Sequence, residues 1–372
     1  MSTEASLATN AAAAQHTAHR IDEFLKEVLS RNGSDLHFIA GDPPRVRMYG
    51  ELHTLRPEPL SPQFVEETLR EIMPRAALAR LEEKHGADFA YIIPGMSRFR
   101  VNVMRHLYGL GCVARAIPSK ALTLDQLDMP AAVRNLCKVN NGLILVTGKT
   151  GSGKSTTLAA MIDDMNSRLK GHILTIEDPI EFVHARKNCL ISQREIGAHS
   201  PSFAEALHSA LREDPDVILV GELRDYETMS IAVTAAEMGI LVMGTLHTNG
   251  AAATVDRMVN AFPADKQSHV RAMLSTSLRG VISQQLIPRA GKPGRVAALE
   301  IMINTPAVAN LIRQGKLDQL ENTIQSGAAH GMRTMDSAIQ ELLDKGVITG
   351  KEAYKKAINK ARFEAVKEIG SG

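Results

Sequence analysis

The chain has 372 residues and a formal net charge of +2, with 44% hydrophobic and 4% aromatic residues. This length is enough for two or three domains, each with a buried core. A charge so close to neutral gives no global basic field that would point to nucleic acid or to an acidic membrane as a partner. The three cysteines, Cys112, Cys137 and Cys189, are scattered. Their spacing argues against a zinc site or a disulfide framework and fits a reducing cytosol.

Residues 1–20 form a polar, alanine-rich stretch without the apolar segment of a secretory signal. We expect this stretch to be a poorly ordered tail. No apolar run approaches the ~20 residues that a membrane helix needs. We therefore expect a cytoplasmic protein, peripheral at a membrane only through a protein partner or a surface contact.

Residues 21–118 mix helical and strand-like patterns, which predicts a small α+β domain. One helix is expected over residues 21–29, where Asn32-Gly33 then stops it, and a single longer helix over residues 64–83. Strands are expected over residues 36–40, 45–49, 88–93, 97–104 and 111–116. Residues 119–141 are expected to form a linker that contains one short helix.

From residue 142 onward apolar strands and helices alternate, which predicts an α/β domain with a mainly parallel sheet covered on both faces. Strands are expected over residues 143–147, 173–176, 217–220 and 240–246, and helices from residue 155, over 202–212 and over 227–238. Ser202 and Glu205 have the spacing of a capping box. Beyond about residue 297 we expect mainly helices, including an amphipathic one over residues 335–343. Residues 351–372 read as a solvated or frayed helix.

The strongest motif is Gly148-Lys149-Thr150-Gly151-Ser152-Gly153-Lys154-Ser155, followed by Thr156, which matches G-x-x-x-x-G-K-[ST] completely. An apolar strand precedes it and a helix-compatible run follows it. Glycines let the backbone fold tightly, so that N–H groups converge on phosphate oxygens at the positive end of the helix. Lys154 is expected to reach the β- and γ-phosphates of ATP, and Ser155 to ligate Mg²⁺.

Two acidic segments follow apolar strands and offer candidate carboxylates for phosphoryl transfer. The first contains Glu177 and Asp178, and either could orient or deprotonate the attacking water. The position is informative because α/β domains place their chemistry at the carboxyl ends of parallel strands. The competing interpretation is an acidic turn that merely ends the strand.

The second acidic segment, residues 214–225, resembles a Walker B strand, an apolar run that ends in an acid. Gly221 occupies the usual place of the aspartate, and Glu222 follows one residue later. We expect Glu222 to act on the magnesium side through water, because Mg²⁺ tends to keep its waters. His247 ends the next strand. It is either a structural histidine or a group that senses the γ-phosphate or transmits its loss.

These segments, in this order, resemble the secretion ATPases of the type II/type IV pilus class, and most closely the type IV pilus retraction ATPases (PilT/PilU-like). The resemblance rests on residues 148–156, on residues 175–181 (the Asp box of that family), on residues 214–225 (its unusual Walker B) and on residues 239–249 (its His box). It extends to residues 33–37, 97–100 and 310–313, and covers the chain from about residue 21 to at least residue 335.

The resemblance implies a homohexameric ring, a PAS-like domain over residues 21–118 and a RecA-like ATPase domain with C-terminal helices over residues 142–372. It implies that Glu177 is the general base and that arginines of the N-terminal domain, with Arg98, Arg100 and Arg115 in the matching strands, complete the nucleotide site. It further implies an ATP-hydrolysing motor for pilus retraction and twitching motility. The implied partners are an inner-membrane pilus platform protein and a paralogous retraction ATPase.

The chain departs from the family pattern at four positions. Lys149 stands where the family usually has proline, and Ile240 where it commonly has the first histidine of the His box. Ala309 and Gln314 replace the commoner arginine and glutamate of the C-terminal retraction-associated motif. These departures leave ATP binding untouched and keep an accessory retraction paralogue open as an alternative.

Three further alternatives remain, one from the same superfamily and two from other classes. A pilus assembly or type II secretion ATPase of the same superfamily would be expected to carry a long N-terminal extension and a four-cysteine zinc element, which this sequence lacks. A RecA-like nucleic-acid motor is disfavoured by the near-neutral charge and the few aromatic residues. A nucleotide-binding regulator without turnover is disfavoured by Glu177.

Overall fold

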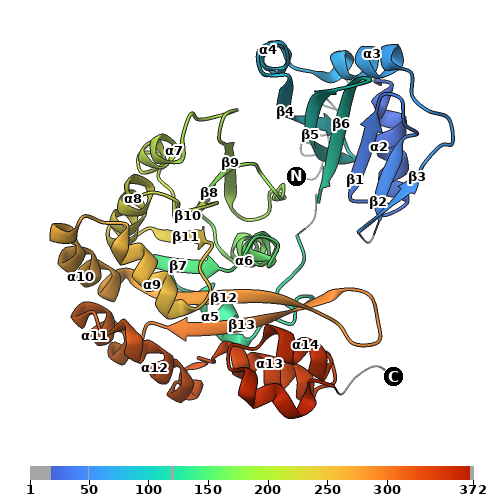
Figure 1. The fold of residues 1–372 in the computed structure, drawn as a ribbon. Helices are drawn as coiled ribbons and strands as arrows, with labels where there is room; N and C mark the ends of the chain where they lie inside the picture. Colours follow the sequence, from blue (N-terminus) through green and yellow to red (C-terminus); the bar gives the residue numbers. More distant parts are fainter. Residues whose placement is uncertain (1–17, 49, 119–120, 369–372) are drawn as a thin grey trace. The chain divides into compact units, whose positions relative to one another are not determined.

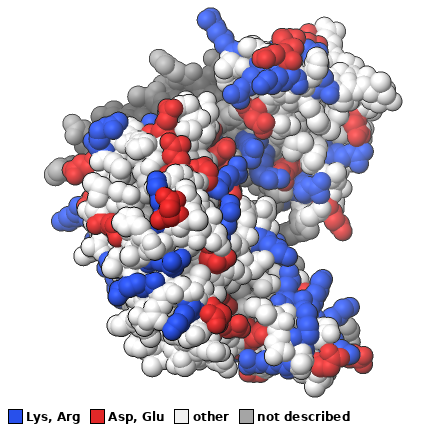
Figure 2. All heavy atoms as spheres, turned by 60° about the vertical axis from the view of Figure 1, so that its left-hand side comes forward, with Lys and Arg blue, Asp and Glu red and all other residues white. Residues whose placement is uncertain are grey.

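The structure is a computed structural model that describes residues 18–48, 50–118 and 121–368. Most of the expected tail, the first two linker residues, Tyr49 and the last four residues lie outside the described residues. The chain divides into two compact units, Met1–Ser119 and Lys120–Gly372. In keeping with the net charge of +2, the face drawn in Figure 2 intersperses acidic and basic side chains. Within the described ranges, no helix is long and apolar enough to span a membrane.

The first unit is an antiparallel six-stranded sheet with the order β3-β2-β1-β6-β5-β4 and helices packed against it (Figure 1). Apolar residues of the helices and of alternate strand positions form one core, and the polar positions of β5 and β6 point to the other face. Its elements are α2 (Ile21–Ser30), β1 (Asp35–Ile39), β2 (Arg45–Met48), β3 (Glu51–Thr54), α3 (Pro62–Ile72), α4 (Arg75–Lys84), β4 (Gly86–Ile93), β5 (Ser97–His106) and β6 (Gly109–Ile117).

The prediction of a single helix over residues 64–83 is wrong, because the structure has two helices, α3 and α4. The break falls at Met73-Pro74, where Met73 adopts an extended conformation with ψ of 125°. A residue that precedes proline is sterically disfavoured in the helical region, so α3 ends there and α4 restarts immediately after Pro74.

The second unit contains a seven-stranded sheet with the order β13-β12-β7-β11-β10-β8-β9, in which only β13 is antiparallel to its neighbour. This confirms the predicted α/β class with a mainly parallel sheet. Its strands are β7 (Gly142–Thr147), β8 (His172–Glu177), β9 (Leu190–Glu195), β10 (Val217–Val220), β11 (Leu241–Leu246), β12 (Leu278–Pro288) and β13 (Arg295–Ile303).

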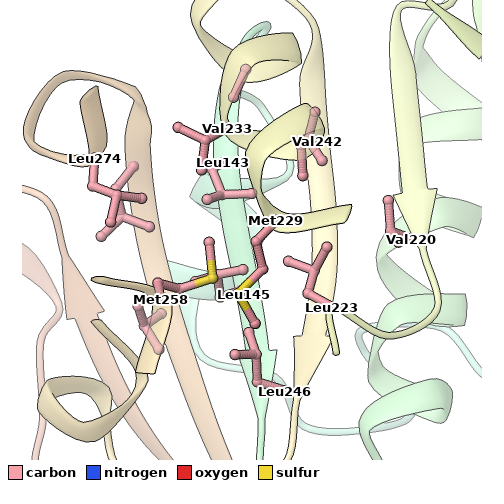
Figure 3. Close-up of a cluster of buried hydrophobic side chains, with 14 of the residues drawn as sticks. Leu143, Leu145, Val220, Leu223, Met229, Val233, Val242, Leu246, Met258 and Leu274 are labelled. Atoms are coloured by element: carbon pink, nitrogen blue, oxygen red, sulfur yellow. The ribbon is translucent and has the colours of Figure 1, made fainter. Parts of the chain in front are cut away.

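Helices cover both faces of this sheet. Its longer helices are α5 (Ala131–Leu136), α6 (Lys154–Arg168), α7 (Phe203–Ala210), α8 (Tyr226–Glu237), α9 (Ala251–Asn260), α10 (Gln267–Ser277), α11 (Pro306–Gln314), α12 (Leu320–Ser326), α13 (Met335–Asp344) and α14 (Gly350–Lys356). Side chains of α7 to α12 form the core on one face, and those of α5 and α6 form the core on the other. In the first of these cores the strand side chains Leu143, Leu145 and Val242 pack with Met229 and Met258 (Figure 3).

The sequence-based expectations missed two features of this sheet. Strand β9 was not expected, because its residues are mostly polar and only half-buried at the edge of the sheet. The chain beyond residue 297 was expected to be mainly helical, but β12 and β13 form a long antiparallel hairpin that continues to Ile303, and the helices begin only at Pro306. The segment before β7 packs on the core of the second unit through Leu124, Val133 and Leu136.

The C-terminal segment is folded onto the end of the β12–β13 hairpin. Helices α13 and α14 and the 3₁₀ helix Lys360–Val366 form a small core of their own with Ile287 and Ala298. Phe363 is completely buried in this core. The described part of residues 351–368 is therefore packed, in contrast to the solvated or frayed helix that its lysines suggested.

Phe363→Ala should lower the free energy of unfolding of the second unit by about 3–5 kcal/mol, because it leaves a cavity in this small core. Denaturant titration followed by circular dichroism would measure the loss. The matched control is Ile358→Ala in the same segment, where the side chain is 62% exposed and a change within about 0.5 kcal/mol is expected. Equal effects of the two substitutions would contradict the packing described here.

Candidate active site

Glycines with positive φ shape the loop between β7 and α6. The φ angles are 139° at Gly148, 77° at Gly151 and 89° at Gly153. A Cβ atom at Gly148 would lie 2.3 Å from the carbonyl oxygen of Gln284, and one at Gly153 would lie 2.6 Å from its Nε2. The two fixed glycines of the sequence motif are therefore required both by backbone conformation and by the close approach of β12.

Gln284, on β12, braces this loop. Its Nε2 donates to the carbonyl oxygen of Ser152 at 2.7 Å, and its Oε1 accepts from the hydroxyl of Thr157 at 2.7 Å. The side chain is buried, so both hydrogen bonds are shielded from water. Sequence reasoning missed Gln284, because it lies 132 positions from Ser152 in the chain and no local pattern marks it.

Lys154 begins α6 and its ammonium group curls back over the loop. Nζ donates to the carbonyl oxygens of Gly148 at 2.9 Å and of Lys149 at 3.4 Å. Burial lowers the pKa of Lys154, although Glu222 and Glu181 act in the opposite direction. Such a partly desolvated cation gains strongly from an anion placed beside it.

The rest of the loop leaves polar groups available. The hydroxyl oxygen of Ser152 is buried and has no hydrogen-bond partner within the described residues. Ser155 and Thr156, in the first turn of α6, are half-buried, and Lys149, Thr150 and Gly151 are exposed. An unpaired buried hydroxyl beside a helix N-terminus fits a site that accepts phosphate oxygens.

A pocket of about 360 Å³ adjoins the first turn of α6. Apolar side chains of the segment before α5 line part of it, and the β12–β13 hairpin contributes further lining residues that include two arginines. The lining residues are Leu122, Gln126, Leu127, Met129, Gly153, Thr156, Thr157, Gln284, Leu286, Arg289, Arg295, Val296 and Ala297. A mainly apolar pocket with a few polar groups has the composition of a small-molecule site.

Glu177 is the last residue of β8 and is 8% exposed. Its Oε1 accepts from the hydroxyl of Thr175 at 2.6 Å and from Nε2 of Gln193 at 3.3 Å, and its Oε2 accepts from the backbone N–H of Glu181 at 3.3 Å. Burial raises the pKa of Glu177, against these three hydrogen bonds. Asp178, the other candidate, is exposed. A buried carboxylate with a raised pKa at the carboxyl end of a parallel strand has the properties of a proton acceptor.

Gly221 follows β10 at the place where a Walker B motif usually has its aspartate. Its N–H donates to the carbonyl oxygen of Ile176 at 2.7 Å, and a Cβ atom here would lie 3.2 Å from that oxygen and 3.2 Å from Cα of Glu177. A side chain at this position would therefore be tight, and β10 and the end of β8 would have to move apart by a few tenths of an ångström to hold it.

Glu222 is engaged at both carboxylate oxygens. Oε2 lies 2.8 Å from a guanidinium nitrogen of Arg224, and Oε1 lies 3.1 Å from Nε2 of His247. Partial burial acts to raise the pKa of Glu222, but Arg224 and His247 outweigh it, so the pKa lies below its usual range. The carboxylate is thus held ionised beside the histidine that ends β11.

The loop follows β7, His247 follows β11, Glu222 comes after β10, and Glu177 is the last residue of β8. These four parallel strands are consecutive in the sheet, in the order β7-β11-β10-β8. Parallel strands end at the same edge, so these side chains share one side of the second unit. Within the described ranges, no group of three or more His, Cys, Asp or Glu side chains could hold a metal ion by itself. This donor set suits Mg²⁺, which is commonly bound by one or two protein oxygens together with substrate phosphates.

Arg98, Arg100 and Arg115 belong to the first unit. Arg100 and Arg115 are directly paired across β5 and β6, and Arg98 lies two residues from Arg100, so all three side chains project from the same face. Arg115 forms an ion pair with Asp35 at 2.7 Å, and Arg100 lies 3.7 Å from Asp88. The three arginines therefore form one cluster on this face of the sheet, together with the carboxylates of Asp35 and Asp88.

Gly221→Asp, which reinstates the usual Walker B acid, should destabilise the second unit by about 1–3 kcal/mol, because the new side chain must push β10 away from β8. Thermal unfolding followed by circular dichroism would measure this loss. Gly86→Ala serves as the control, since its Cβ atom would make only an ordinary contact, 3.5 Å from the carbonyl oxygen of Val103. A variant Gly221→Asp as stable as the natural chain would show that the approach of the strands is not limiting.

Comparison with known proteins relates nearly the full length of the chain to one family. A family described as "Type II/IV secretion system protein" matches residues 10–372. The chain is 50% identical to the "Type IV pilus retractation ATPase PilT" of Pseudomonas aeruginosa, over 91% of this chain and 98% of that protein. It is 37% identical to the "Type IV pilus ATPase PilU" of the same organism, over 94% of this chain and 92% of that protein.

The fold is also shared with a solved structure of this group. The crystal structure of "the Pilus Retraction Motor PilT and Bound ADP" superimposes with a TM-score of 0.87 at 42% identity, covering 94% of this chain and all of that chain. The similarity extends over both units, which confirms the expected arrangement of a RecA-like ATPase domain preceded by a smaller N-terminal α+β domain. The chain belongs to the type II/IV secretion system ATPase family.

Proposed function

We propose that this chain is an ATP-hydrolysing motor that drives the retraction of type IV pili. The observation that carries the proposal is the combination of a complete phosphate-binding loop with a buried carboxylate, Glu177, at the end of another parallel strand of the same sheet. The similarity to a pilus retraction ATPase at 50% identity over nearly the full length gives this hydrolytic site its biological setting.

The loop of residues 148–156 binds the phosphates of ATP in this proposal. Lys154 moves from its backbone acceptors, the carbonyl oxygens of Gly148 and Lys149, to the β- and γ-phosphates. The exposed ammonium group of Lys149 adds positive charge at the mouth of the loop. The base and ribose lie in the adjoining pocket, where Leu122, Leu127 and Met129 offer an apolar surface to a planar ring.

Mg²⁺, when bound, neutralises charge on the phosphates and holds them in place. Ser155 would ligate it directly. Glu222 would act through a water molecule, since both of its oxygens already have protein partners. His247 contacts Glu222, so a change in the phosphates that disturbs Glu222 is passed to the end of β11.

Glu177 is the general base of the proposed reaction. Its carboxylate takes a proton from the water that attacks the γ-phosphorus, and ADP leaves with the electron pair of the broken phosphoanhydride bond. The burial that raises the pKa of Glu177 also increases the strength of the carboxylate as a base.

We further propose a homohexameric ring in which Arg98, Arg100 and Arg115 complete the site at a domain or subunit interface. An arginine brought in late stabilises charge on the transferring phosphoryl group and couples hydrolysis to domain motion. The domain boundaries in this proposal are residues 21–118 and 142–372. Force reaches the pilus through an inner-membrane platform protein, which would hold the motor at the cytoplasmic side of the membrane.

An accessory role beside a second retraction ATPase is the nearest alternative, and the departures at Lys149, Ile240, Ala309 and Gln314 motivated it. The higher identity to PilT than to PilU, 50% against 37%, favours the principal motor. A nucleic-acid motor is disfavoured by the mixed surface charge (Figure 2).

Glu177→Gln should bind ATP with unchanged affinity but lose hydrolysis by at least about a hundredfold, because the amide cannot accept the proton of the attacking water. Calorimetry would measure binding, and phosphate release would measure turnover. Lys154→Ala is the companion variant and should lose binding itself. If Glu177→Gln turns over normally, the base lies elsewhere.

Deletion of the gene should leave cells with excess surface pili and without twitching motility, because pili are then assembled but not withdrawn. Electron microscopy of surface pili and stab assays of motility would score the phenotype. Complementation with the natural gene should restore motility, and complementation with the Glu177→Gln allele should not. Loss of pili on deletion would instead indicate an assembly ATPase.

A further inference from the structure

Strand β9 supports the segment that follows Glu177. Gln193 spans this segment, since its Nε2 donates to the carbonyl oxygen of Phe182 at 2.8 Å and its Oε1 accepts from the backbone N–H of His184 at 2.9 Å. Two residues along the same strand, a carboxylate oxygen of Glu195 accepts from the N–H of Ile180 at 3.0 Å. The turn after β8 is therefore fastened to β9 at several points.

The same strand also reaches the candidate base. Nε2 of Gln193 lies 3.3 Å from Oε1 of Glu177, and the hydroxyl of Thr175 donates to that same oxygen at 2.6 Å. Thr175 is fully buried and stands two residues before Glu177 on β8, so both side chains project from one face of the strand. Oε1 thus has two side-chain donors, whereas Oε2 has one backbone donor, the N–H of Glu181 at 3.3 Å.

We propose that Thr175 and Gln193 are positioning residues that hold Oε1 of Glu177, so that Oε2 is the oxygen that takes the proton from the attacking water. The inference rests on the proposed role of Glu177 as the base and adds which oxygen acts and what aims it. Two side-chain donors on one oxygen remove the freedom of the carboxylate to rotate, and this pre-organisation favours a single direction of proton transfer.

The two donors also set the pH at which the base loses its proton-accepting form. Hydrogen bonds to a carboxylate favour its charged form and lower its pKa, so they oppose the effect of burial on Glu177. Among the described residues the charged group that bears on Glu177 is Glu181, which follows β8 and raises its pKa. The residue of β9 that contacts Glu177 is the neutral Gln193, and after β10 the backbone of Gly221 lies beside Glu177.

The direction of the pH effect follows from these contacts. Removing Thr175 or Gln193 as a donor raises the pKa of Glu177, because the carboxylate is then less stabilised relative to the neutral acid. A general base works only when deprotonated, so kcat should begin to fall at a higher pH in the variants than in the natural chain. Binding of ATP does not use these groups, so KM should stay within about twofold.

The test compares pH profiles of kcat for ATP hydrolysis by the full chain and its variants. Thr175→Val, which keeps the shape and removes the hydroxyl, should move the acid limb upward by about one pH unit and lower the plateau several-fold. Gln193→Leu should move it in the same direction by less, since its contact is longer. Thr175→Ser retains the hydroxyl and should restore the natural limb.

The matched control is Ser192→Ala on the same strand. The hydroxyl of Ser192 forms a hydrogen bond with Nε2 of His172 at 2.8 Å and, among the described residues, none with Glu177, so the acid limb should not move. Variants that lose kcat at all pH values without a shift of the limb would overturn the inference and leave a merely structural role. The role of Glu177 as the base has its own test, because persistent ATP hydrolysis by Glu177→Gln would contradict that role whatever the variants of Thr175 and Gln193 show.

Discussion

The parallel pairing of β7, β11, β10 and β8 is the constraint on which the site depends. The four strands end at the same edge of the sheet, and each carries one part of the candidate site at or just after its end. These parts are the loop after β7, His247 after β11, Glu222 after β10 and Glu177 at the end of β8. No pair of these groups is adjacent in sequence, so the buried apolar strands, which cannot slip without exposing their side chains, fix the distances between them. The geometry of the candidate site is therefore a consequence of core packing.

Much of this arrangement could be predicted from the sequence. The loop of residues 148–156 has glycines at fixed positions. They adopt positive φ angles, which favour glycine, so this local requirement is visible in the sequence. Glu177, Glu222 and His247 were selected because each follows a short apolar run, and the structure places them at the ends of β8, β10 and β11. The alternation of strands and helices was enough for the fold class because buried parallel strands read as apolar runs.

The features that could not be predicted from the sequence are mostly those that depend on contacts between distant parts of the chain. Gln193 and Gln284 are polar residues whose importance lies in partners far away in the chain, at Phe182 and Glu177 for one and at Ser152 for the other. Strand β9 has no apolar alternation because it lies at an edge. The single helix predicted over residues 64–83 is interrupted at Pro74. The residue before a proline disfavours the helical conformation, and this effect outweighs the helical periodicity of the segment. Hydrogen bonds between residues distant in the chain, and strands at the edge of a sheet, produce no clear local pattern in a single sequence.

The close approach at Gly221 has a consequence for recognising such sites. A side chain there would make tight contacts with Glu177 and Ile176, and the acid instead stands one position later, beside Arg224 and His247. A search that demands an aspartate at the end of this strand would discard the chain as a degenerate nucleotidase. A search for an apolar strand that ends in glycine and glutamate, with a second glutamate after the neighbouring strand, would retrieve it. Gly221 and the candidate base Glu177 are in contact, so a substitution tolerated at one position should depend on the residue present at the other.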